Sequence, residues 1–260
     1  MNEKNNVTAV ERTILLIRAI SLSPEPVGVT ELSKQTGIPK PTVSRFCVTL
    51  TNLGMFDRNE QDEYSLGLIF IALGERVKAS RNSAEIAQPY IDKLAKDIGE
   101  SINLGICNED TVYTIYNVSG ESSVLVSKLV PISPLYCSSL GKIFLMHRSK
   151  DEIISFFDQE LPKRTIYTQT TYEDYLNWKQ EYDKTGVTTE TEEYEYGLSC
   201  IAAPLYDHEK KLIAAISLSA PTSRLELKGR KELAQKLKET ASEISAIYDK
   251  LYIRRKDISG

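Results

Sequence analysis

The chain has 260 residues, of which 41% are hydrophobic, and its formal net charge at pH 7 is −4. That negative charge argues against a protein that coats nucleic acid regardless of sequence, because such binding depends on Lys and Arg neutralising phosphates. No apolar run approaches the roughly 20 residues of a membrane-spanning helix, and residues 1–8 lack the basic-then-apolar order of a signal peptide, so we expect a cytoplasmic protein with no membrane partner.

The N-terminal segment predicts a helix at residues 7–22. Val10, Ile14 and Ile17 recur at helical spacing and are expected to form its buried stripe. The prolines in residues 23–28 end this helix, because Pro cannot continue it.

The segment 27–66 has the order of elements typical of a winged helix-turn-helix domain. Thr30 is placed to cap a short helix through residue 35, Gly37 supplies the turn, and Pro41 occupies the first turn of the next helix. The apolar residues of that second helix, expected to point inward, are Val43, Phe46, Cys47, Leu50 and Leu53. The opposite face then carries Pro41, Ser44, Arg45, Val48, Thr49 and Asn52.

A hairpin, or wing, is predicted after Gly54. Residues 56–66 change to a period of two around a polar tip at 57–63. The tip is rich in acidic residues, which repel phosphate. Arg58 is the residue of this tip that suits a phosphate contact.

Charge in this segment is segregated toward the outward helix face, since residues 32–56 contain Lys34, Lys40 and Arg45 and no Asp or Glu. The first residues of the second helix meet base edges in such domains, while Lys, Arg and hydroxyl side chains hold phosphates. The predicted DNA contacts are Lys40, Pro41, Thr42, Ser44, Arg45 and Arg58. Arg45 suits a guanine as well as a phosphate, and Thr42 has the alternative role of a helix cap.

The rest of the chain predicts an α+β fold with an antiparallel sheet and helices packed against it. The expected helices are at 68–80, 84–94, 140–147, 151–157 and 172–184, before a long C-terminal helix. The expected strands are at 101–107, 111–118, 124–130, 187–193, 198–205 and 212–218. The buried face of the last helix is expected to comprise Leu233, Leu237, Ala241, Ile244, Ile247 and Leu251.

Three motifs of this second half follow one another in order: SPLYCSSLGKIFL at 133–145, GVTTETEEYEYGLSCIAAPLYD at 186–207 and AAISLSAPTSRL at 214–225. Together with the helix-turn-helix and the YSLG at 64–67, they resemble the IclR family of bacterial transcription regulators over nearly the whole chain.

The resemblance implies a domain plan and a function. It implies a winged helix-turn-helix DNA-binding domain at 1–72, a linker helix at 73–84 and a GAF-like effector-binding domain at 85–260. The partners would be double-stranded operator DNA, a small organic acid and further copies of the chain in a homodimer or homotetramer. We expect a repressor rather than an activator, acting on a neighbouring catabolic operon. Pro41 stands where the family usually has Ser, which predicts an altered operator preference.

Carried over by position, the effector-binding residues are Ser139, Leu140, Gly141, Glu190, Cys200, Ser217 and Ser219. The period of two in strands also places Cys200, Ala202 and Pro204 on one face of their strand, and Ser217 and Ser219 on one face of theirs. Leu140 is larger than the residues often found there and is expected to reshape the cavity. Beside a ligand carboxylate, Glu190 would be protonated or would accept a hydrogen bond from a ligand hydroxyl, which favours a hydroxylated acid.

Two rival functions compete with this prediction. An enzyme using Cys200 as nucleophile would need a nearby base, and the chain offers only His147 and His208, neither within a recognisable motif. The other three cysteines are Cys47, Cys107 and Cys137, and their wide spacing predicts no disulfide framework, metal site or cofactor. A sensor acting through protein contacts is the second rival, but the acid-free face around Arg45 favours DNA.

Overall fold

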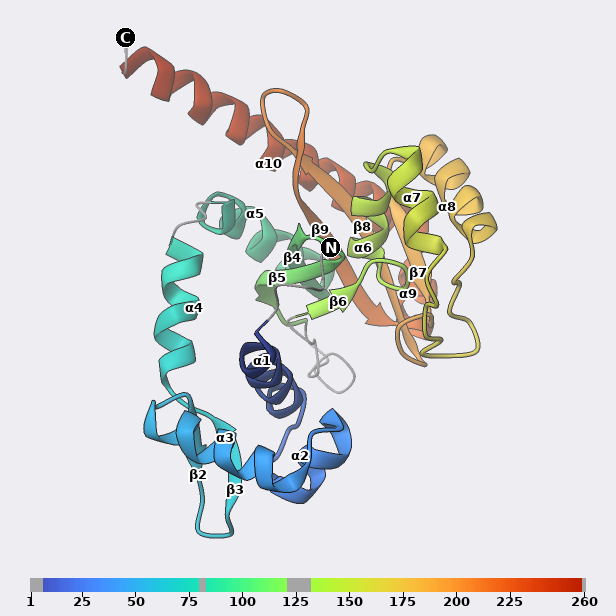
Figure 1. Cartoon of the computed structure of the whole chain (residues 1–260). Coiled ribbons are helices and arrows are strands. Elements are labelled where there is room, and N and C mark those ends of the chain that lie inside the picture. Colours follow the sequence, from blue (N-terminus) through green and yellow to red (C-terminus); the bar gives the residue numbers. More distant parts are fainter. Residues whose placement is uncertain (1–6, 80–82, 121–131, 259–260) are drawn as a thin grey trace. The chain divides into compact units, whose positions relative to one another are not determined.

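The computed structural model describes residues 7–79, 83–120 and 132–258, and it divides into two compact units, Met1–Arg81 and Asn82–Gly260 (Figure 1). The predicted strand at 124–130 lies outside the described residues. Within the part of the chain that the structure describes, no helix combines the length and the apolar character that crossing a membrane requires.

The first unit is a winged helix-turn-helix, as predicted. Its elements are α1 (Thr8–Ser21), β1 (Val27–Gly28), α2 (Val29–Thr36), α3 (Lys40–Asn52), β2 (Phe56–Arg58), β3 (Glu63–Leu66) and α4 (Ile69–Ala79). The strands form an antiparallel sheet in the order β1-β3-β2. Gly37 ends α2 in the left-handed conformation, with a φ of 70°, which glycine adopts without steric cost.

The capping of α2 and the buried face of α1 differ from the sequence-based predictions. Thr30 is not the cap of α2, because Gly28 pairs with Glu63 in the sheet and the helix begins directly after it. On α1, Val10 is 59% exposed and Ile14 is 44% exposed, whereas Leu16 and Ile20 are buried. The segment has apolar residues on more than one face, so packing against α2 and β3 decides which face is buried.

The core of the first unit otherwise follows the helical pattern of α3. Val43, Cys47 and Leu50 are buried and Phe46 packs against them, but Leu53 is 63% exposed because it lies at the end of the helix. The core is completed by Leu16, Ile20, Val27, Leu32, Ile38, Phe56 and Tyr64.

The second unit has the expected α+β architecture, a six-stranded antiparallel sheet in the order β6-β5-β4-β9-β8-β7. The strands are β4 (Ser101–Asn108), β5 (Thr111–Val118), β6 (Ile132–Pro134), β7 (Thr188–Thr191), β8 (Leu198–Tyr206) and β9 (Leu212–Pro221). The helices are α5 (Ser83–Ile98), α6 (Ser139–Met146), α7 (Lys150–Phe157), α8 (Tyr172–Thr185), α9 (Thr222–Lys228) and α10 (Arg230–Ile258). The segment predicted as a linker helix, 73–84, begins inside α4 and ends inside α5.

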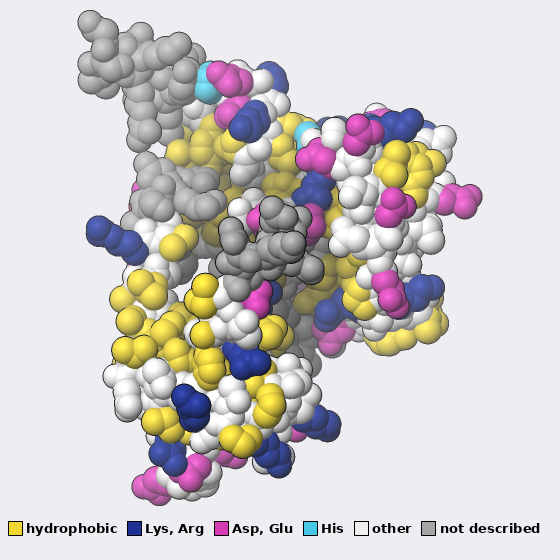
Figure 2. Space-filling view, viewed as in Figure 1, with side chains coloured by type: hydrophobic (Ala, Val, Ile, Leu, Met, Phe, Trp, Pro, Cys, Tyr) yellow, Lys and Arg dark blue, Asp and Glu magenta, His cyan; other side chains and the backbone are white. Residues whose placement is uncertain are grey.

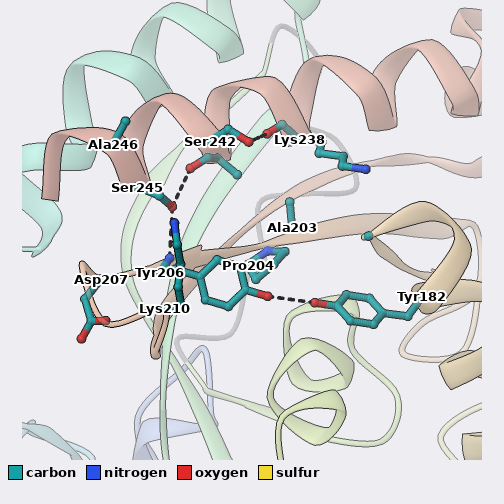
Figure 3. A pocket seen from close by; sticks show the side chains of 12 residues that line it. Tyr182, Ala203, Pro204, Tyr206, Asp207, Lys210, Lys238, Ser242, Ser245 and Ala246 are labelled. Carbon is teal, nitrogen blue, oxygen red and sulfur yellow. Dashed lines mark hydrogen bonds between the residues drawn. The ribbon is translucent and has the colours of Figure 1, made fainter. Parts of the chain in front are cut away.

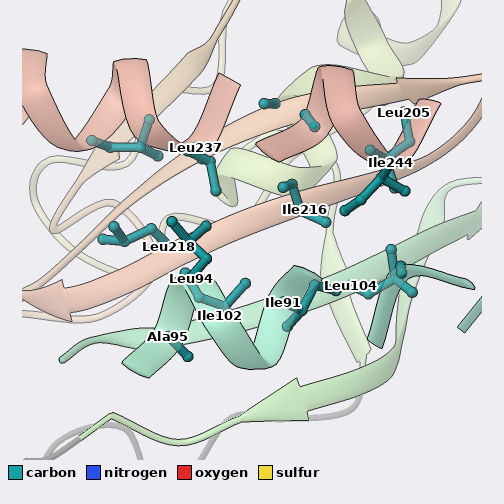
Figure 4. Packing of buried hydrophobic residues seen from close by; sticks show 14 of the residues in the cluster. Ile91, Leu94, Ala95, Ile102, Leu104, Leu205, Ile216, Leu218, Leu237 and Ile244 are labelled. Atoms are coloured by element: carbon teal, nitrogen blue, oxygen red, sulfur yellow. The ribbon is translucent and has the colours of Figure 1, made fainter. Parts of the chain in front are cut away.

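The two faces of this sheet are covered differently. Helices α5 and α10 pack on one face, where Ile91, Leu104, Ile216, Leu237 and Ile244 belong to one apolar cluster (Figure 4). Each such side chain contributes about 1.5–3 kcal/mol when fully buried. Helices α6, α7 and α8 cover the other face, and there the strands present small and polar residues.

Candidate functional site

The predicted DNA contacts of α3 lie at its N-terminal end and on its outer face. Lys40, Pro41 and Arg45 are exposed, while Thr42 and Ser44 are half-buried. Pro41 stands in the first turn, and Pro39 precedes the helix as its cap residue. Thr42 lies within the helix, so it is not the cap. These five side chains therefore all lie in the first two turns of one helix, α3.

An apolar residue of this outer face was not among the predicted contacts. Val48 is 43% exposed, one turn beyond Ser44. An apolar side chain in the major groove can contact the methyl group of thymine. The sequence indicated Val48 only through its place among the outward-facing residues of the predicted helix. On the face shown in Figure 2, Lys and Arg side chains lie among hydrophobic ones over this unit.

Arg58 lies in the hairpin and is engaged with an acidic neighbour. Its Nη2 lies 2.6 Å from Oδ1 of Asp62, and both side chains are exposed. Such an exposed pair contributes only about 0–1 kcal/mol, so a phosphate can replace Asp62 at little cost.

In the second unit, the strand register aligns the predicted effector residues. Glu190 of β7 pairs with Cys200 of β8, Cys200 pairs with Ser219 of β9, and Ser219 pairs with Ser101 of β4. Residues paired across an antiparallel sheet share a face, so these four polar side chains form one row. All four are buried.

A second row runs beside the first and contains a residue that the sequence analysis missed. Ser217 pairs with Asn103 of β4. The Asn103 Nδ2 donates to the hydroxyls of Ser219 at 3.1 Å and Ser217 at 3.4 Å, while its Oδ1 accepts from Asn117 at 2.7 Å. The thiol of Cys200 donates to Ser219 at 3.2 Å. Ser101 and Asn103 are two residues apart on β4 and therefore lie on the same face. This spacing could have indicated Asn103 from the sequence.

The N-terminus of α6 closes the cluster on the side facing β7. Ser139, Leu140 and Gly141 form its first turn, and the hydroxyl of Thr188 donates to the Ser139 carbonyl at 2.7 Å. Position 141 requires glycine, because a Cβ there would lie 2.5 Å from the carbonyl oxygen of Leu135. The structure therefore brings all seven predicted effector residues to one side of the sheet.

A buried ion pair supports this cluster. Lys142 of α6 is fully buried, and its Nζ lies 2.5 Å from Oε1 of Glu193, 3.2 Å from the carbonyl oxygen of Thr189 and 4.0 Å from the ring centre of Trp178. Burial lowers the pKa of Lys142 and raises the pKa of Glu193, while each opposes the shift of the other. We describe them as a charged pair, because each compensates the other's desolvation.

Glu190 has an incompletely satisfied carboxyl group. Its side chain is 1% exposed; Oε2 accepts from the backbone N–H of Glu193 at 3.0 Å, and Oε1 has no hydrogen-bond partner among the described residues. Burial raises the pKa of Glu190 from 4.5 to about 7, against the lowering effects of Cys200 and Lys142. The group therefore exchanges its proton near neutral pH.

Cys200 is not placed as a nucleophile. Burial raises the pKa of its thiol well above 9.0, and the nearby Glu190 raises it further. Both nitrogens of His147 are engaged elsewhere, with the Ile143 carbonyl and with Tyr206. His208 lies in the β8–β9 turn beside Glu209. The cluster is suited to holding a small polar ligand by hydrogen bonds.

Comparison with known families and proteins agrees with this geometry. Residues 76–246 match the family described as bacterial transcriptional regulator IclR C-terminal, and residues 9–60 match the IclR helix-turn-helix domain.

Individual relatives match over most of their length. The DNA-binding transcriptional repressor YiaJ of Escherichia coli K12 is 32% identical over 243 residues, which cover 90% of this chain and 85% of that protein. The crystal structure of the Thermotoga maritima IclR has a TM-score of 0.69 and 25% identity, covering 94% of this chain and 99% of that one. An IclR homologue from Microbacterium hydrocarbonoxydans, complexed with 4-hydroxybenzoate, shares the fold with a TM-score of 0.75 and 18% identity, covering 92% of this chain and 98% of that one.

Proposed function

Because the chain belongs to the IclR family of bacterial transcriptional regulators, we propose that it is a cytoplasmic repressor whose operator binding is controlled by a small organic acid. In this proposal it has no enzyme activity and regulates a neighbouring catabolic operon. The observation that supports the effector role is the buried Glu190, with one carboxyl oxygen left without a partner inside a polar cluster.

Operator recognition is assigned to the N-terminal unit. The outer face of α3 would enter the major groove, with Arg45 on a guanine or a phosphate and Lys40, Thr42 and Ser44 on the backbone. Arg58 would hold a phosphate beside the hairpin. We retain 1–72 as the DNA-binding domain, 73–84 as the linker and 85–260 as a GAF-like effector domain.

A single recognition helix reads few base pairs, so the proposal includes a symmetric dimer over two half-sites roughly 34 Å apart or a multiple of it. Exposed apolar residues suited to such an interface lie on both α1 and α4. They are Val10 and Ile14 on α1, and Ile69, Ile71, Leu73 and Val77 on α4. An isologous contact between two copies would bury them. Pairing of dimers into tetramers is the further assembly that we propose.

The effector would be a hydroxylated monocarboxylic acid. Asn103, Ser217 and Ser219 supply hydrogen-bonding groups for it, and a protonated Glu190 would avoid repelling its carboxylate. The related fold that holds 4-hydroxybenzoate makes this acid the first compound to test.

The test of the function is a mobility-shift titration of the full chain on the DNA upstream of its own gene. We expect a retarded band that resists excess unrelated DNA, and a lower affinity when 4-hydroxybenzoate or another hydroxy acid is added. Affinity should fall steeply with salt, as phosphate neutralisation requires. Equal binding to unrelated DNA would contradict the proposal of a specific operator.

The pH dependence of effector binding follows from Glu190. Its pKa of about 7 means that the proton is present at pH 6 and largely lost at pH 8. We expect affinity for an acid to fall by about tenfold between these values, because a protonated Glu190 does not repel the carboxylate of the ligand and an ionised one does.

The folded chain without effector should also lose stability as pH rises from 4.5 through about 7, since a raised pKa means that folding favours the protonated group.

Glu190→Gln is the matched variant, because an amide resembles the protonated carboxyl group. Its affinity for the acid should stay at the wild-type pH 6 level up to pH 8, as measured by calorimetric titration with 4-hydroxybenzoate. A wild-type pH slope that persists in Glu190→Gln would show that another group titrates. A loss of affinity at both pH values would favour an ionised Glu190 that accepts from the ligand hydroxyl.

A further inference from the structure

A cavity lies in the C-terminal unit, at the C-terminal end of α8. It has a volume of about 340 Å³ and is lined by residues of α8, β8, the β8–β9 turn and α10 (Figure 3). Ligand pockets commonly enclose about 300–1,000 Å³, so this one has room for a small organic molecule. Its lining contains none of the seven proposed effector residues.

The cavity exists because small residues face one another across it. Gly186 follows α8, Ala203 lies on β8, and Ala241, Ser242 and Ala246 lie on α10. Elsewhere along the same helix, Leu237 and Ile244 fill the space above the sheet. The open volume is therefore a local property of the sequence where α10 crosses β8.

One end of the cavity carries two joined phenol groups. The hydroxyl of Tyr182 lies 3.2 Å from that of Tyr206, which lies 2.8 Å from Nε2 of His147. The Nδ1 of His147 lies 2.8 Å from the carbonyl oxygen of Ile143, which can only accept. For a neutral His147 the order is fixed: Nδ1 donates to Ile143, Tyr206 donates to Nε2, and Tyr182 donates to Tyr206. The oxygen of Tyr182 retains free capacity to accept.

The charged groups of the lining favour an anion. Lys238 donates to the carbonyl oxygen of Thr185 at 2.7 Å, which uses one of its three ammonium hydrogens. Among the residues that the structure describes, no carboxylate pairs with it. The carboxylate of Asp207 instead accepts from the backbone N–H groups of Glu209 and Lys211, both at 2.9 Å. Lys210 adds a second cation at the rim.

Lys238 also has a structural role, because it holds a carbonyl at the C-terminal end of α8, where a cation is favourable. That hydrogen bond holds the ammonium group of this exposed side chain beside Gly186. A Cβ at Gly186 would lie 3.1 Å from its Nζ, so the chain leaves room for the lysine at that position. An anchored cation with two unused hydrogens is suited to receive a carboxylate.

We propose that this cavity is a second ligand site, which takes a small monocarboxylate with a flat apolar body. The carboxylate lies at Lys238, the body lies against Ala203 and Pro204, and a hydroxyl on the ligand donates to Tyr182. The hydrogen-bonded chain from Tyr182 through Tyr206 continues to His147, the C-cap residue of α6, so it connects the ligand to the helix whose first turn carries Ser139 and Gly141. The site does not depend on the proposed effector role of Glu190.

The test uses benzoate as probe and benzamide as its neutral control of the same shape, in calorimetric titrations of the full chain. We expect saturable binding of benzoate and at least tenfold weaker binding of benzamide. Lys238→Gln removes the cation, and Ser242→Leu fills the cavity from the exposed side of α10. Each should weaken benzoate at least tenfold, while Lys231→Gln, a matched loss of charge on the same helix, should leave it unchanged.

Glu190→Leu separates this site from the effector cluster, because unlike Glu190→Gln it removes the hydrogen-bonding group of the proposed effector site. Benzoate binding that survives Glu190→Leu and is lost in both Lys238→Gln and Ser242→Leu supports the second site. The proposal is overturned if benzoate gives no saturable heat, or if Lys238→Gln and Ser242→Leu bind it as the wild type does. Binding lost only in Glu190→Leu also overturns it and leaves the proposed effector role standing. Circular dichroism and the thermal midpoint verify the fold of each variant. If either Lys238→Gln or Ser242→Leu misfolds, benzoate binding by the other of these two variants decides the test.

Discussion

Arg45→Ala is expected to abolish specific operator binding by the full chain. A good bidentate contact between Arg and guanine contributes about 1–3 kcal/mol, and the proposed dimer would present two copies, so we expect a loss of about 2–6 kcal/mol. This corresponds to about 30-fold to 20,000-fold in affinity. The substitution should not affect stability, because Arg45 is exposed on the face opposite Val43, Cys47 and Leu50. The measurement is a mobility-shift titration at fixed salt.

Two further variants determine what Arg45 does. Arg18→Ala removes the same charge from the exposed last turn of α1 and should bind the operator nearly as the wild type does. Arg45→Lys keeps the charge but loses the planar fork. If Arg45 holds a phosphate, Lys should restore most of the affinity, whereas a guanine contact would leave specificity impaired. Unchanged operator binding by Arg45→Ala would refute the role given to the outer face of α3.

Lys142→Met is expected to destabilise the C-terminal unit by about 3–5 kcal/mol, the usual effect of removing one partner of a buried ion pair. The substitution leaves the buried carboxyl group of Glu193 without its cation, in a cluster that already contains Glu190. Urea unfolding can be followed by tryptophan fluorescence, because the chain has one tryptophan and Trp178 lies against Lys142, with 4.0 Å from Nζ to the ring centre.

The control for this loss is Lys179→Met. Lys179 pairs with Asp183 on α8 with both side chains exposed, and such pairs contribute about 0–1 kcal/mol. The double variant Lys142→Met with Glu193→Leu should recover most of the stability, because a buried pair replaced by apolar groups is often neutral. A Lys142→Met chain within about 1 kcal/mol of the wild type would show that the pair is not a major stabilising contact.

The helix-turn-helix was predictable because its signals are local. Gly37 and Pro41 mark the turn and the start of α3 within a few residues of where the structure places them. The buried face of α1 was predicted only in part, since Ile17 packs against the core whereas Val10 and Ile14 are exposed. An apolar segment with residues on several faces does not reveal which face will meet the rest of the unit.

The gathering of the seven proposed effector residues on one side of the sheet was predictable from the resemblance and from the period of two along the strands. The burial of Lys142 was not predictable from the sequence, because its partner Glu193 lies 51 residues further along the chain. Only the packing of α6 against β7 brings the two together. Asn103 was missed for a similar reason, since its hydrogen-bond partners Ser217 and Ser219 lie on a strand 114 and 116 residues away.

The ion pair of Lys142 and Glu193 also bears on how much charge the proposed effector cluster could hold. The pair is neutral overall, so an ionised Glu190 carries one buried negative charge. In the proposed complex, a monocarboxylate beside a protonated Glu190 would carry the same single charge, so above the pKa of Glu190 binding would replace one buried anion by another. A dicarboxylate would add a second negative charge beside Lys142, a cation that Glu193 already neutralises. The proposed site should therefore prefer monoacids to diacids, and its hydroxyl and amide groups would select among the monoacids.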